Sequence, residues 1–470
     1  MNTGTQLAVI GAGPAGLAAA LAARAAGLAV TVIDQNPAAG GQIYRGLATA
    51  SDQQRAALGP DYARGARLLA QFAACGAKLI GEAQVWDITA AGVALWRDAR
   101  CEIIPADQII LATGAMERPS ALPGWTLPGV WNAGALQILM KQAGLVPSGR
   151  VALLGNGPLL LLLARQLRAA GVAIGGFLDT RPRGSLRRAL PYLPGALRAA
   201  PDLLKGLGLL RDFAASSVPH WRLDRAPRIE AEGHRLRLDF FAQDQPQNLE
   251  ADLVLLHHGV IPNTQLTRLL RLPHDWDAAQ QAWRPRVGRW GATSRRNLRI
   301  VGDAVGIDGA LAAEAAGYLA GLGAAQTAGR LTAAEANARA CHWERLLRRQ
   351  RALRPLLDAL YAPPPWLLRP ADEVTVCRCE NVSAATLRAM AKLGCRGPNQ
   401  TKFFSRCGMG ACQGRMCGDS VTQILAEATG LTIQEVGQYR LRPPLVPMAL
   451  AALATLAQTP PETSRGEDAE

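Results

Sequence analysis

The chain lacks several features that would place it in other classes of protein. No apolar run reaches about 18 residues, so we expect no transmembrane segment. The first residues have no basic segment followed by an apolar one, which argues against a secretory signal peptide and favours a cytoplasmic location. No basic run is interleaved with aromatic residues, and helix-turn-helix and zinc-finger spacings are missing. We therefore expect no nucleic-acid partner.

Lysine is scarce. Only five of the 51 basic residues are lysines, and the formal net charge is +14. Such a composition fits a genome rich in arginine and alanine codons as well as a selected surface, so it argues only weakly for an anionic partner. Residues 181–211 are both basic and apolar. Three roles remain open for this segment: docking on a partner subunit, peripheral docking on the inner face of a membrane, and packing on its own domain.

Cysteine is absent between Cys101 and Cys341, although the chain has nine cysteines in all. Six of the nine lie close together near the C-terminus, between Cys377 and Cys417. An odd, clustered set in a chain without an export signal indicates a metal site rather than a disulfide framework. The 470 residues, 49% hydrophobic and 19% charged, suit a globular protein of two or three domains.

A dinucleotide-binding unit opens the chain. Residues 7–10 are an expected strand, residues 11–16 read GAGPAG, and residues 17–26 are an expected helix. A second expected strand, residues 28–33, is followed by an acid, Asp34. In this motif the glycines allow a tight turn, close approach to a pyrophosphate and close helix packing, while the acid accepts from a ribose hydroxyl. The complete unit predicts dinucleotide binding.

A second unit of this kind begins at residue 151. A strand leads into the loop GNGPLL, a helix follows, and a second strand reaches Asp179. Leu160 stands where the third glycine is expected, which changes how closely helix and strand pack. Three alternatives remain open for the ligand of this domain: NAD(P), another adenine nucleotide, or none. The pair His257 and His258 ends a later strand, where we expect packing at a domain junction rather than catalysis.

The cysteine-rich segment predicts a metal centre. Cys377 and Cys379 are separated by one residue, and Cys412 and Cys417 by four. Four thiolates in two close pairs suit zinc or a [2Fe–2S] cluster, and the spacing of the first pair is too tight for a zinc knuckle. The glycines between the pairs would let backbone amides point at the sulfur atoms. An iron–sulfur cluster is favoured.

Three further motifs resemble the flavoproteins with two dinucleotide domains, the disulfide reductase-like group. These motifs are residues 40–42 (GGQ), residues 109–114 (IILATG) and residues 300–304 (IVGDA). The resemblance implies an α/β fold that binds FAD, with Asp303 on the ribityl chain; a cap of the next helix is the alternative role for Asp303. By this resemblance the flavin-binding residues are Gly11, Gly13, Pro14, Ala15, Gly16, Asp34, Gln35, Gly41, Gln42, Val85, Thr113, Gly114, Gly302 and Asp303. The missing cysteine pair argues against disulfide reduction itself.

The C-terminal segment resembles the small helical [2Fe–2S] domain of bacterioferritin-associated ferredoxin type. The matching pattern is CRC followed by GMGACQGRMC. It implies that the cluster ligands are Cys377, Cys379, Cys412 and Cys417. Cys395 and Cys407 fall outside the pattern.

Residues 116–119 (MERP), 123–130 and 201–212 extend the resemblance over nearly the whole chain. They resemble the larger, alpha subunit of FAD-dependent amine dehydrogenases of the opine oxidase, D-hydroxyproline dehydrogenase and hydrogen cyanide synthase type. In that group a partner beta subunit, similar to D-amino acid and glycine oxidases, oxidises the substrate on its own FAD. A small ferredoxin-like gamma subunit is often present, and the alpha subunit moves electrons away.

This resemblance implies an electron-transfer subunit, and no catalytic residue is assigned because no nucleophile–base arrangement is evident. A stand-alone NAD(P)H-dependent ferredoxin-type reductase and a non-catalytic scaffold are the alternatives. The expected domains are a flavin domain split into residues 1–148 and 285–345, with a nucleotide domain at 149–284. A linker at 346–370, an iron–sulfur domain at 371–430 and a tail at 431–470 follow. Residues 458–470 are predicted to be disordered.

Overall fold

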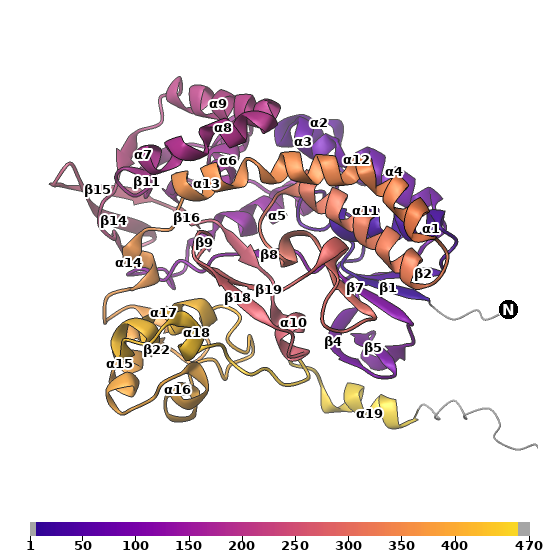
Figure 1. The fold of residues 1–470 in the computed structure, drawn as a ribbon. Helices are drawn as coiled ribbons and strands as arrows, with labels where there is room; N and C mark the ends of the chain where they lie inside the picture. The colour runs from indigo at the N-terminus through magenta and orange to yellow at the C-terminus, as the bar shows by residue number, and fades with distance from the viewer. Residues whose placement is uncertain (1–5, 459–470) are drawn as a thin grey trace, which may run out of the picture.

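The computed structural model describes residues 6–458 (Figure 1). The predicted disordered segment lies outside these residues except for Gln458, the last residue of α19 (Leu450–Gln458). Two five-stranded parallel sheets carry most of the helices, and a helical segment, residues 374–437, lies beneath the second sheet in Figure 1. Among the described residues, every helix is too short or too polar to cross a membrane.

The first sheet holds the N-terminal glycine loop. Its strands, in spatial order, are β20 (Leu298–Ile300), β7 (Gln108–Leu111), β1 (Leu7–Ile10), β2 (Val30–Ile33) and β3 (Lys78–Ile80). All four neighbouring pairs are parallel. β1 and β2 are fully buried because nearly all of their residues are aliphatic. Strands far apart in sequence thus bring their carboxyl ends to one edge.

Two helices pack closely on this sheet, α1 (Pro14–Ala25) and α11 (Ala310–Thr327) (Figure 1). A Cβ on Gly317 of α11 would stand 1.9 Å from the carbonyl oxygen of Ala15, so only glycine permits this approach. α1 begins at Pro14, ahead of the predicted start at residue 17, because proline suits the first turn of a helix.

The second sheet repeats this plan. Its strands are β12 (His220–Arg222), β11 (Ile174–Asp179), β10 (Val151–Gly155), β16 (Leu253–His257) and β9 (Val130–Asn132), all parallel. Helices α5 (Ala133–Ala143) and α6 (Pro158–Ala169) pack beside it. The antiparallel pair β8 (Ala115–Glu117) and β17 (Val260–Pro262) joins the two halves of the molecule.

Smaller elements complete these two halves. The antiparallel strands are β4 (Gln84–Thr89), β5 (Gly92–Arg97), β6 (Arg100–Ile104), β13 (Arg228–Glu232), β14 (Arg235–Ala242), β15 (Gln245–Ala251), β18 (His274–Asp277) and β19 (Ala282–Pro285). The short helices are α2 (Asp52–Leu58), α3 (Pro60–Ala63), α4 (Gly65–Ala74) and α10 (Gln265–Leu269). Three more, α7 (Ser185–Ala189), α8 (Leu193–Ala196) and α9 (Ala200–Ala214), form an excursion between β11 and β12.

The C-terminal part begins with α12 (Ala333–Arg351), α13 (Arg354–Leu360) and α14 (Pro365–Leu368), so the predicted linker is largely helical. We call residues 374–437 the cysteine module. It contains β21 (Thr375–Cys377), β22 (Val382–Ser383), α15 (Ala384–Lys392), α16 (Pro398–Ser405), α17 (Gly418–Thr429) and α18 (Ile433–Val436). The final helix, α19, packs on β6, where Ala452 joins a small core with Trp86 and Cys101.

Candidate functional site

The loop between β1 and α1 is built so that only glycine fits at two positions. Gly11 has a φ of 108°, and a Cβ there would lie 2.3 Å from the carbonyl oxygen of Ala112. A Cβ on Gly16 would lie 1.8 Å from the carbonyl oxygen of Gly11. The first turn of α1 has neither an acidic residue nor a side-chain cap. Its amide groups are therefore available to a phosphate.

Asp34, which follows β2, is hydrogen-bonded to this loop. One carboxylate oxygen accepts from the amide of Ala12 at 2.6 Å, and the other accepts from the amide and side chain of Asn36 at 2.8 and 2.7 Å. The oxygen that accepts from Ala12 has a second lone pair, so a ribose hydroxyl can still donate to Asp34. Gln35 is exposed beside it, and the amide of Ala83 donates to the carbonyl of Asp34, which brings the strand of Val85 to the same edge.

The GGQ loop closes over the glycine loop. A Cβ on Gly41 would stand 2.6 Å from the Cα of Gly13, so the two backbones are in close contact. The carbonyl of Gln42 accepts from the ammonium of Lys141 at 3.0 Å. Burial, followed by the neighbouring Arg45, lowers the pKa of Lys141 to about 8. The structure therefore adds a buried cation that the motifs did not reveal.

Asp303 lies where β20 ends, beside the start of α11. Its Oδ1 accepts from the amides of Asp308 and Gly309 at 3.2 and 3.3 Å, which gives it part of the capping role considered above. Within residues 6–458, Oδ2 has no hydrogen-bond partner. Burial raises the pKa of Asp303 above its ordinary value. A Cβ on Gly302 would stand 2.8 Å from the Cβ of Ala15, so this turn meets the glycine loop.

The remaining predicted flavin residues lie along the same edge. Thr113 and Gly114 follow β7, and the hydroxyl of Thr113 donates to the carbonyl of Asn263 at 3.2 Å. The amide of Thr113 lies next to Gly11. The structure thus gathers residues from four strand ends at the carboxyl edge of the first sheet, the usual place for a ligand in such sheets.

The second glycine loop keeps its tight turns. Gly155 and Gly157 have φ values of 145° and 103°, and Leu160 is fully buried in the place of the third glycine. Asp179 is also buried. Burial alone would raise its pKa, but hydrogen bonds from His220 and Arg181 lower it.

A cavity of about 470 Å³ opens beside Asp179. Three aromatic side chains, Phe177, Phe213 and Tyr361, line it. Within the described chain, the buried Oδ1 of Asn156 at its edge has no hydrogen-bond partner. The amide of the same side chain donates to the carbonyl of Ala362 at 3.3 Å, so the segment after α13 crosses the glycine loop.

The two adjacent histidines are packed at the junction of the halves. Nδ1 of His257 lies 2.6 Å from a carboxylate oxygen of Glu117, and Nδ1 of His258 lies 2.7 Å from the hydroxyl of Ser120. Both imidazoles are at least 97% buried. This agrees with the expectation of a packed pair.

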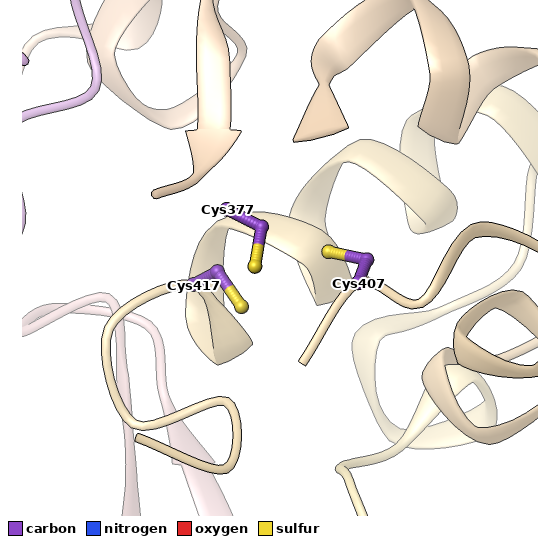
Figure 2. Close-up of side chains that lie close together, drawn as sticks. All are labelled: Cys377, Cys407 and Cys417. Carbon is purple, nitrogen blue, oxygen red and sulfur yellow. The ribbon is translucent and has the colours of Figure 1, made fainter. Parts of the chain in front are cut away.

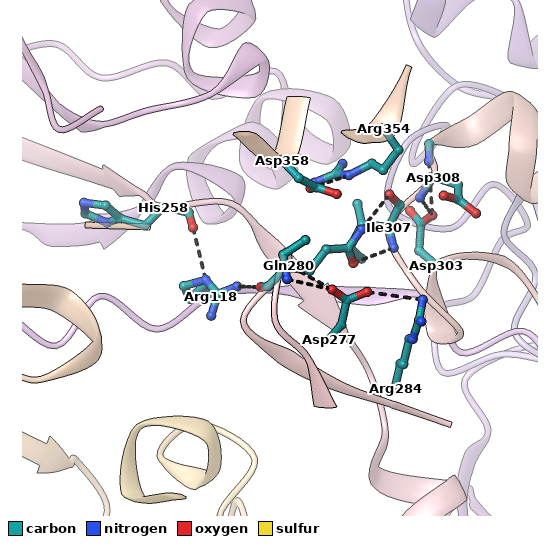
Figure 3. A network of polar contacts seen from close by, with 12 residues as sticks. Arg118, His258, Asp277, Gln280, Arg284, Asp303, Ile307, Asp308, Arg354 and Asp358 are labelled. Atoms are coloured by element: carbon teal, nitrogen blue, oxygen red, sulfur yellow. Dashed lines mark hydrogen bonds and ion pairs between the residues drawn. The ribbon is translucent and has the colours of Figure 1, made fainter. Parts of the chain in front are cut away.

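Figure 3 shows a chain of polar contacts from this junction to the loop of Asp303. The guanidinium of Arg118 donates to the carbonyls of His258 and Gln280. The side chain of Gln280 then exchanges two hydrogen bonds with the backbone of Ile307, at 3.1 and 3.3 Å. The position of the second half is thereby tied to the loop of Asp303.

Burial of His258 predicts a pH dependence of stability. Burial, followed by the charges of His257 and Arg118, lowers its pKa from 6.5 to about 3. Between these values the unfolded chain binds a proton that the folded chain does not, so stability falls as pH falls, by up to about 1.4 kcal/mol per pH unit. We expect the thermal midpoint of the protein to drop between neutral pH and about pH 5. In His258→Asn this drop should shrink, whereas an identical drop in both proteins would contradict the assignment.

The cysteine module brings three buried thiols together (Figure 2). The sulfur atoms of Cys377, Cys407 and Cys417 lie within 4.8 Å of one another. Contacts with Cys407 and Cys417 lower the pKa of Cys377 to about 2, and the contact with Cys377 raises that of Cys407 to about 12. The amides of Gly408 and Glu380 also donate to Cys377. Two thiols and two amides thus surround the sulfur atom of Cys377.

The other two predicted ligands form a second pair. The thiol of Cys379 contacts the thiol and the backbone amide of Cys412. Cys379 is exposed and Cys412 is half-buried, so this pair lies nearer the surface than Cys377 and Cys417. A Cβ on Gly410 would lie 2.2 Å from the Cβ of Cys379. The four cysteines of the predicted set therefore lie in an inner and an outer pair, and Cys407 adds a thiol at the inner pair.

Charged and aromatic residues surround the inner pair. The ring of Tyr439 packs against the cysteine loop, where a Cβ on Gly408 or Gly414 would come within 2.5 Å of it. Arg268, from α10, donates to the carbonyl of Tyr439 at 3.0 Å. Burial lowers the pKa of Arg268, while the nearby Asp419 and Cys417 oppose this effect. A cation from α10 thus lies beside the cysteine cluster.

Two families of known proteins match consecutive parts of the chain. A family model described as pyridine nucleotide-disulphide oxidoreductase matches residues 5–317, more than half of the chain. The chain belongs to the pyridine nucleotide-disulphide oxidoreductase family. Membership of this family implies a flavin cofactor, and it confirms the predicted α/β fold with two dinucleotide domains. A second model, the sarcosine oxidase A3 domain, matches residues 374–456, which include the cysteine module.

Two relatives at 31–40% identity match over almost their whole length. An opine oxidase subunit from Rhizobium meliloti (strain 1021) is 40% identical, over 96% of this chain and 98% of the relative. Hydrogen cyanide synthase subunit HcnB of Pseudomonas aeruginosa is 31% identical, over 95% of this chain and 98% of the relative. These matches confirm the resemblance to alpha-type subunits. The crystal structure of L-proline dehydrogenase from P. horikoshii shares the fold, with a TM-score of 0.70 and 18% identity over 96% of this chain and 79% of that one.

The sequence motifs did not identify several residues that lie near the candidate sites. Lys141, Arg268 and Tyr361 come from elements distant in sequence from the loops they contact. Each stands in a helix or helix end whose local pattern is ordinary. Cys407 did carry a signal, since it lies in the cysteine-rich segment, but its spacing fell outside the motif.

Proposed function

We propose that the chain is the electron-transfer subunit of a multi-subunit amine or imino-acid dehydrogenase and carries FAD and a [2Fe–2S] cluster. The observation that supports it most is the presence, in one chain, of a flavin-type glycine cradle and of five cysteines in contacting groups. The names of the relatives, which are subunits of opine oxidase and of hydrogen cyanide synthase, favour an amine donor for the complex.

In this proposal the residues around the glycine loop hold FAD. The amides at the start of α1 bind the pyrophosphate, Asp34 accepts from the ribose, and the free oxygen of Asp303 accepts from the ribityl chain. Gln35, Gln42, Val85 and Thr113 line the same edge. Flavin accepts two electrons at once and returns them singly, which suits a neighbouring one-electron centre.

The cluster is proposed to sit between the two cysteine pairs, with Cys377 and Cys417 inside and Cys379 and Cys412 outside. Four cysteine thiolates, two for each iron, are the usual ligands of a [2Fe–2S] centre. The amides of Gly408 and Glu380, which donate to Cys377, would stabilise added negative charge on the sulfur atoms. Arg268 of α10 would act in the same direction.

The substrate is proposed to be oxidised elsewhere. A beta subunit with its own FAD, similar to D-amino acid or glycine oxidases, would take the amine, and a small ferredoxin-like gamma subunit would complete the complex in the cytoplasm. Opines, D-hydroxyproline, proline and glycine are the candidate substrates. The two histidines are held by Glu117 and Ser120, and burial at the junction of the halves closes Ser120 and both imidazoles off from a substrate.

The second nucleotide domain is proposed to bind NAD(P) or another adenine nucleotide in the cavity beside Asp179. Its aromatic walls suit an adenine ring, and the unpartnered oxygen of Asn156 offers an acceptor. Hydride transfer to the flavin, as in a stand-alone NAD(P)H-dependent ferredoxin-type reductase, is the second candidate function. It is disfavoured because the segment after α13 crosses the glycine loop at Asn156.

One experiment tests the cofactor content and separates the two functions. The chain is purified alone without oxygen, its flavin is released and identified, and iron and acid-labile sulfide are assayed. We expect one FAD with about two irons and two sulfides per chain. We also expect NADH and NADPH to leave the flavin oxidised. Rapid bleaching by either would favour the reductase, and zinc in place of iron would contradict electron transfer through the module.

A further inference from the structure

The excursion of α7, α8 and α9 exposes its largest apolar side chains. Six leucines recur at intervals of three or four residues, with one interval of seven, and are 41–68% exposed. They are Leu186, Leu190, Leu193, Leu197, Leu204 and Leu207, and we call them the leucine stripe. Intervals of three or four residues place successive leucines on the same side of a helical turn. Exposure of so many leucines is costly unless something covers them.

The inner side of the same segment carries small residues. Ala189, Ala196 and Ala199 are buried, and the first two pack in a small core with Leu356 of α13. Amphipathic helices of soluble proteins normally turn their large apolar residues inward. In α7 and α8 this order is reversed, because only small residues are buried there. The helix α9 buries Leu209 and still leaves Leu204 and Leu207 outside, so the stripe does not serve the core of this chain.

Basic side chains flank the stripe. Within the described residues, Arg187, Arg188, Arg198 and Arg211 make no ion pair. Both acids of α9 are already engaged: the carboxylate of Asp202 accepts from Gln350, and that of Asp212 pairs with Arg168. The rim of the stripe is therefore positively charged.

We propose that the leucine stripe docks this chain on an anionic lipid surface. Leucines on one side with arginines at the flanks are the pattern of helices that lie in the membrane interface. A protein partner is a poorer fit because protein interfaces favour aromatic residues and avoid charge at their centres, whereas Tyr192 is the only exposed aromatic side chain among residues 185–214. Prolines at 191, 194 and 201 break the segment into short helices that can lie flat on a surface.

The position of the stripe fits such docking. Figure 1 places α8 and α9 at the top of the molecule and α15 and α16 of the cysteine module at the bottom. A chain bound through the stripe would thus keep its cysteine module free. Surface residues alone carry this inference, so it holds whether or not the chain has the function proposed above.

Vesicle flotation of the purified full-length chain tests the docking. Vesicles of phosphatidylcholine mixed with phosphatidylglycerol are compared with vesicles of phosphatidylcholine alone. We expect binding to the anionic vesicles that weakens with salt. The triple variant Leu190→Glu, Leu197→Glu and Leu204→Glu should bind about tenfold more weakly. Its three sites are more than half exposed, so its thermal midpoint should stay near that of the wild type.

Two further variants make the result specific. Leu393→Glu changes an equally exposed leucine on the cysteine module and should leave binding intact. The variant Arg187→Gln, Arg198→Gln and Arg211→Gln should lose the preference for anionic vesicles. Failure of the wild type to float, or unchanged binding by the leucine variant, would overturn the proposal. Loss of a partner subunit from the leucine variant, with vesicle binding intact, would overturn it in favour of a protein interface.

Discussion

Cys417→Ser is expected to lose nearly all of the iron and sulfide of the purified chain while keeping its FAD. Cys417 is buried and its thiol contacts Cys377, so it belongs to the inner pair of the proposed ligand set. A serine hydroxyl binds iron poorly in place of a thiolate. The module should lose stability as well, since metal binding contributes to folding of small metal-binding domains. Iron, sulfide and flavin are measured on the same sample.

Further cysteine variants distinguish the cluster ligands from cysteines that do not bind iron. Cys395→Ser removes another buried thiol of the module, one outside the cluster of three, and should keep its iron. The pair Cys407→Ser and Cys412→Ser distinguishes two ligand sets. If the predicted set holds, Cys412→Ser loses iron and Cys407→Ser keeps it. The opposite result would assign the inner cluster of three as ligands, and full iron in Cys417→Ser would contradict a cluster at this site.

The second large effect is expected at Gly16. In Gly16→Ala the new methyl group would stand 1.8 Å from the carbonyl oxygen of Gly11 and 3.0 Å from its carbon. Both atoms are backbone, so relief requires α1 to move away from β1 and opens the phosphate cradle. We expect soluble protein to contain little or no FAD and to unfold at a clearly lower temperature.

A matched glycine provides the control. Gly206 lies within α9 with open space around its Cα, so Gly206→Ala should keep FAD and be as stable as the wild type or slightly more so. Released flavin per chain and the thermal midpoint are measured for both variants. A Gly16→Ala protein with a full complement of FAD would show that the loop does not bind the cofactor.

Local signals predicted the parts of the site that depend on backbone shape. Gly11 and Gly16 could be identified because steric limits on a strand–turn–helix unit act within a few residues. The burial of His257 and His258 followed from their place at the end of an apolar strand. A cluster of cysteines could be expected because its members lie within a few dozen residues of each other. The pairing could not, since Cys377 contacts Cys417 and Cys379 contacts Cys412 rather than their neighbours in sequence.

Contacts between distant elements could not be predicted in this way. Nothing near Arg268 in the sequence indicates that it approaches Cys417, and nothing near Tyr361 indicates a nucleotide-type cavity. The leucine stripe shows a different limit. Periodicity identifies the two sides of a helix, but whether leucine or alanine faces the core depends on the space left by α13, here filled by Ala189 and Ala196.

Electron paramagnetic resonance of the complex can follow electrons from an amine to the cysteine module. The tagged chain is purified with its partners from its natural host, and candidate amines are added without oxygen: an opine, D-hydroxyproline, proline and glycine. We predict that one of these amines produces the signal of a reduced [2Fe–2S] centre in the complex and none in the isolated chain. Reduction of the isolated chain by an amine, or a complex whose flavins are reduced while the cysteine module stays silent, would contradict an electron-transfer role for this chain.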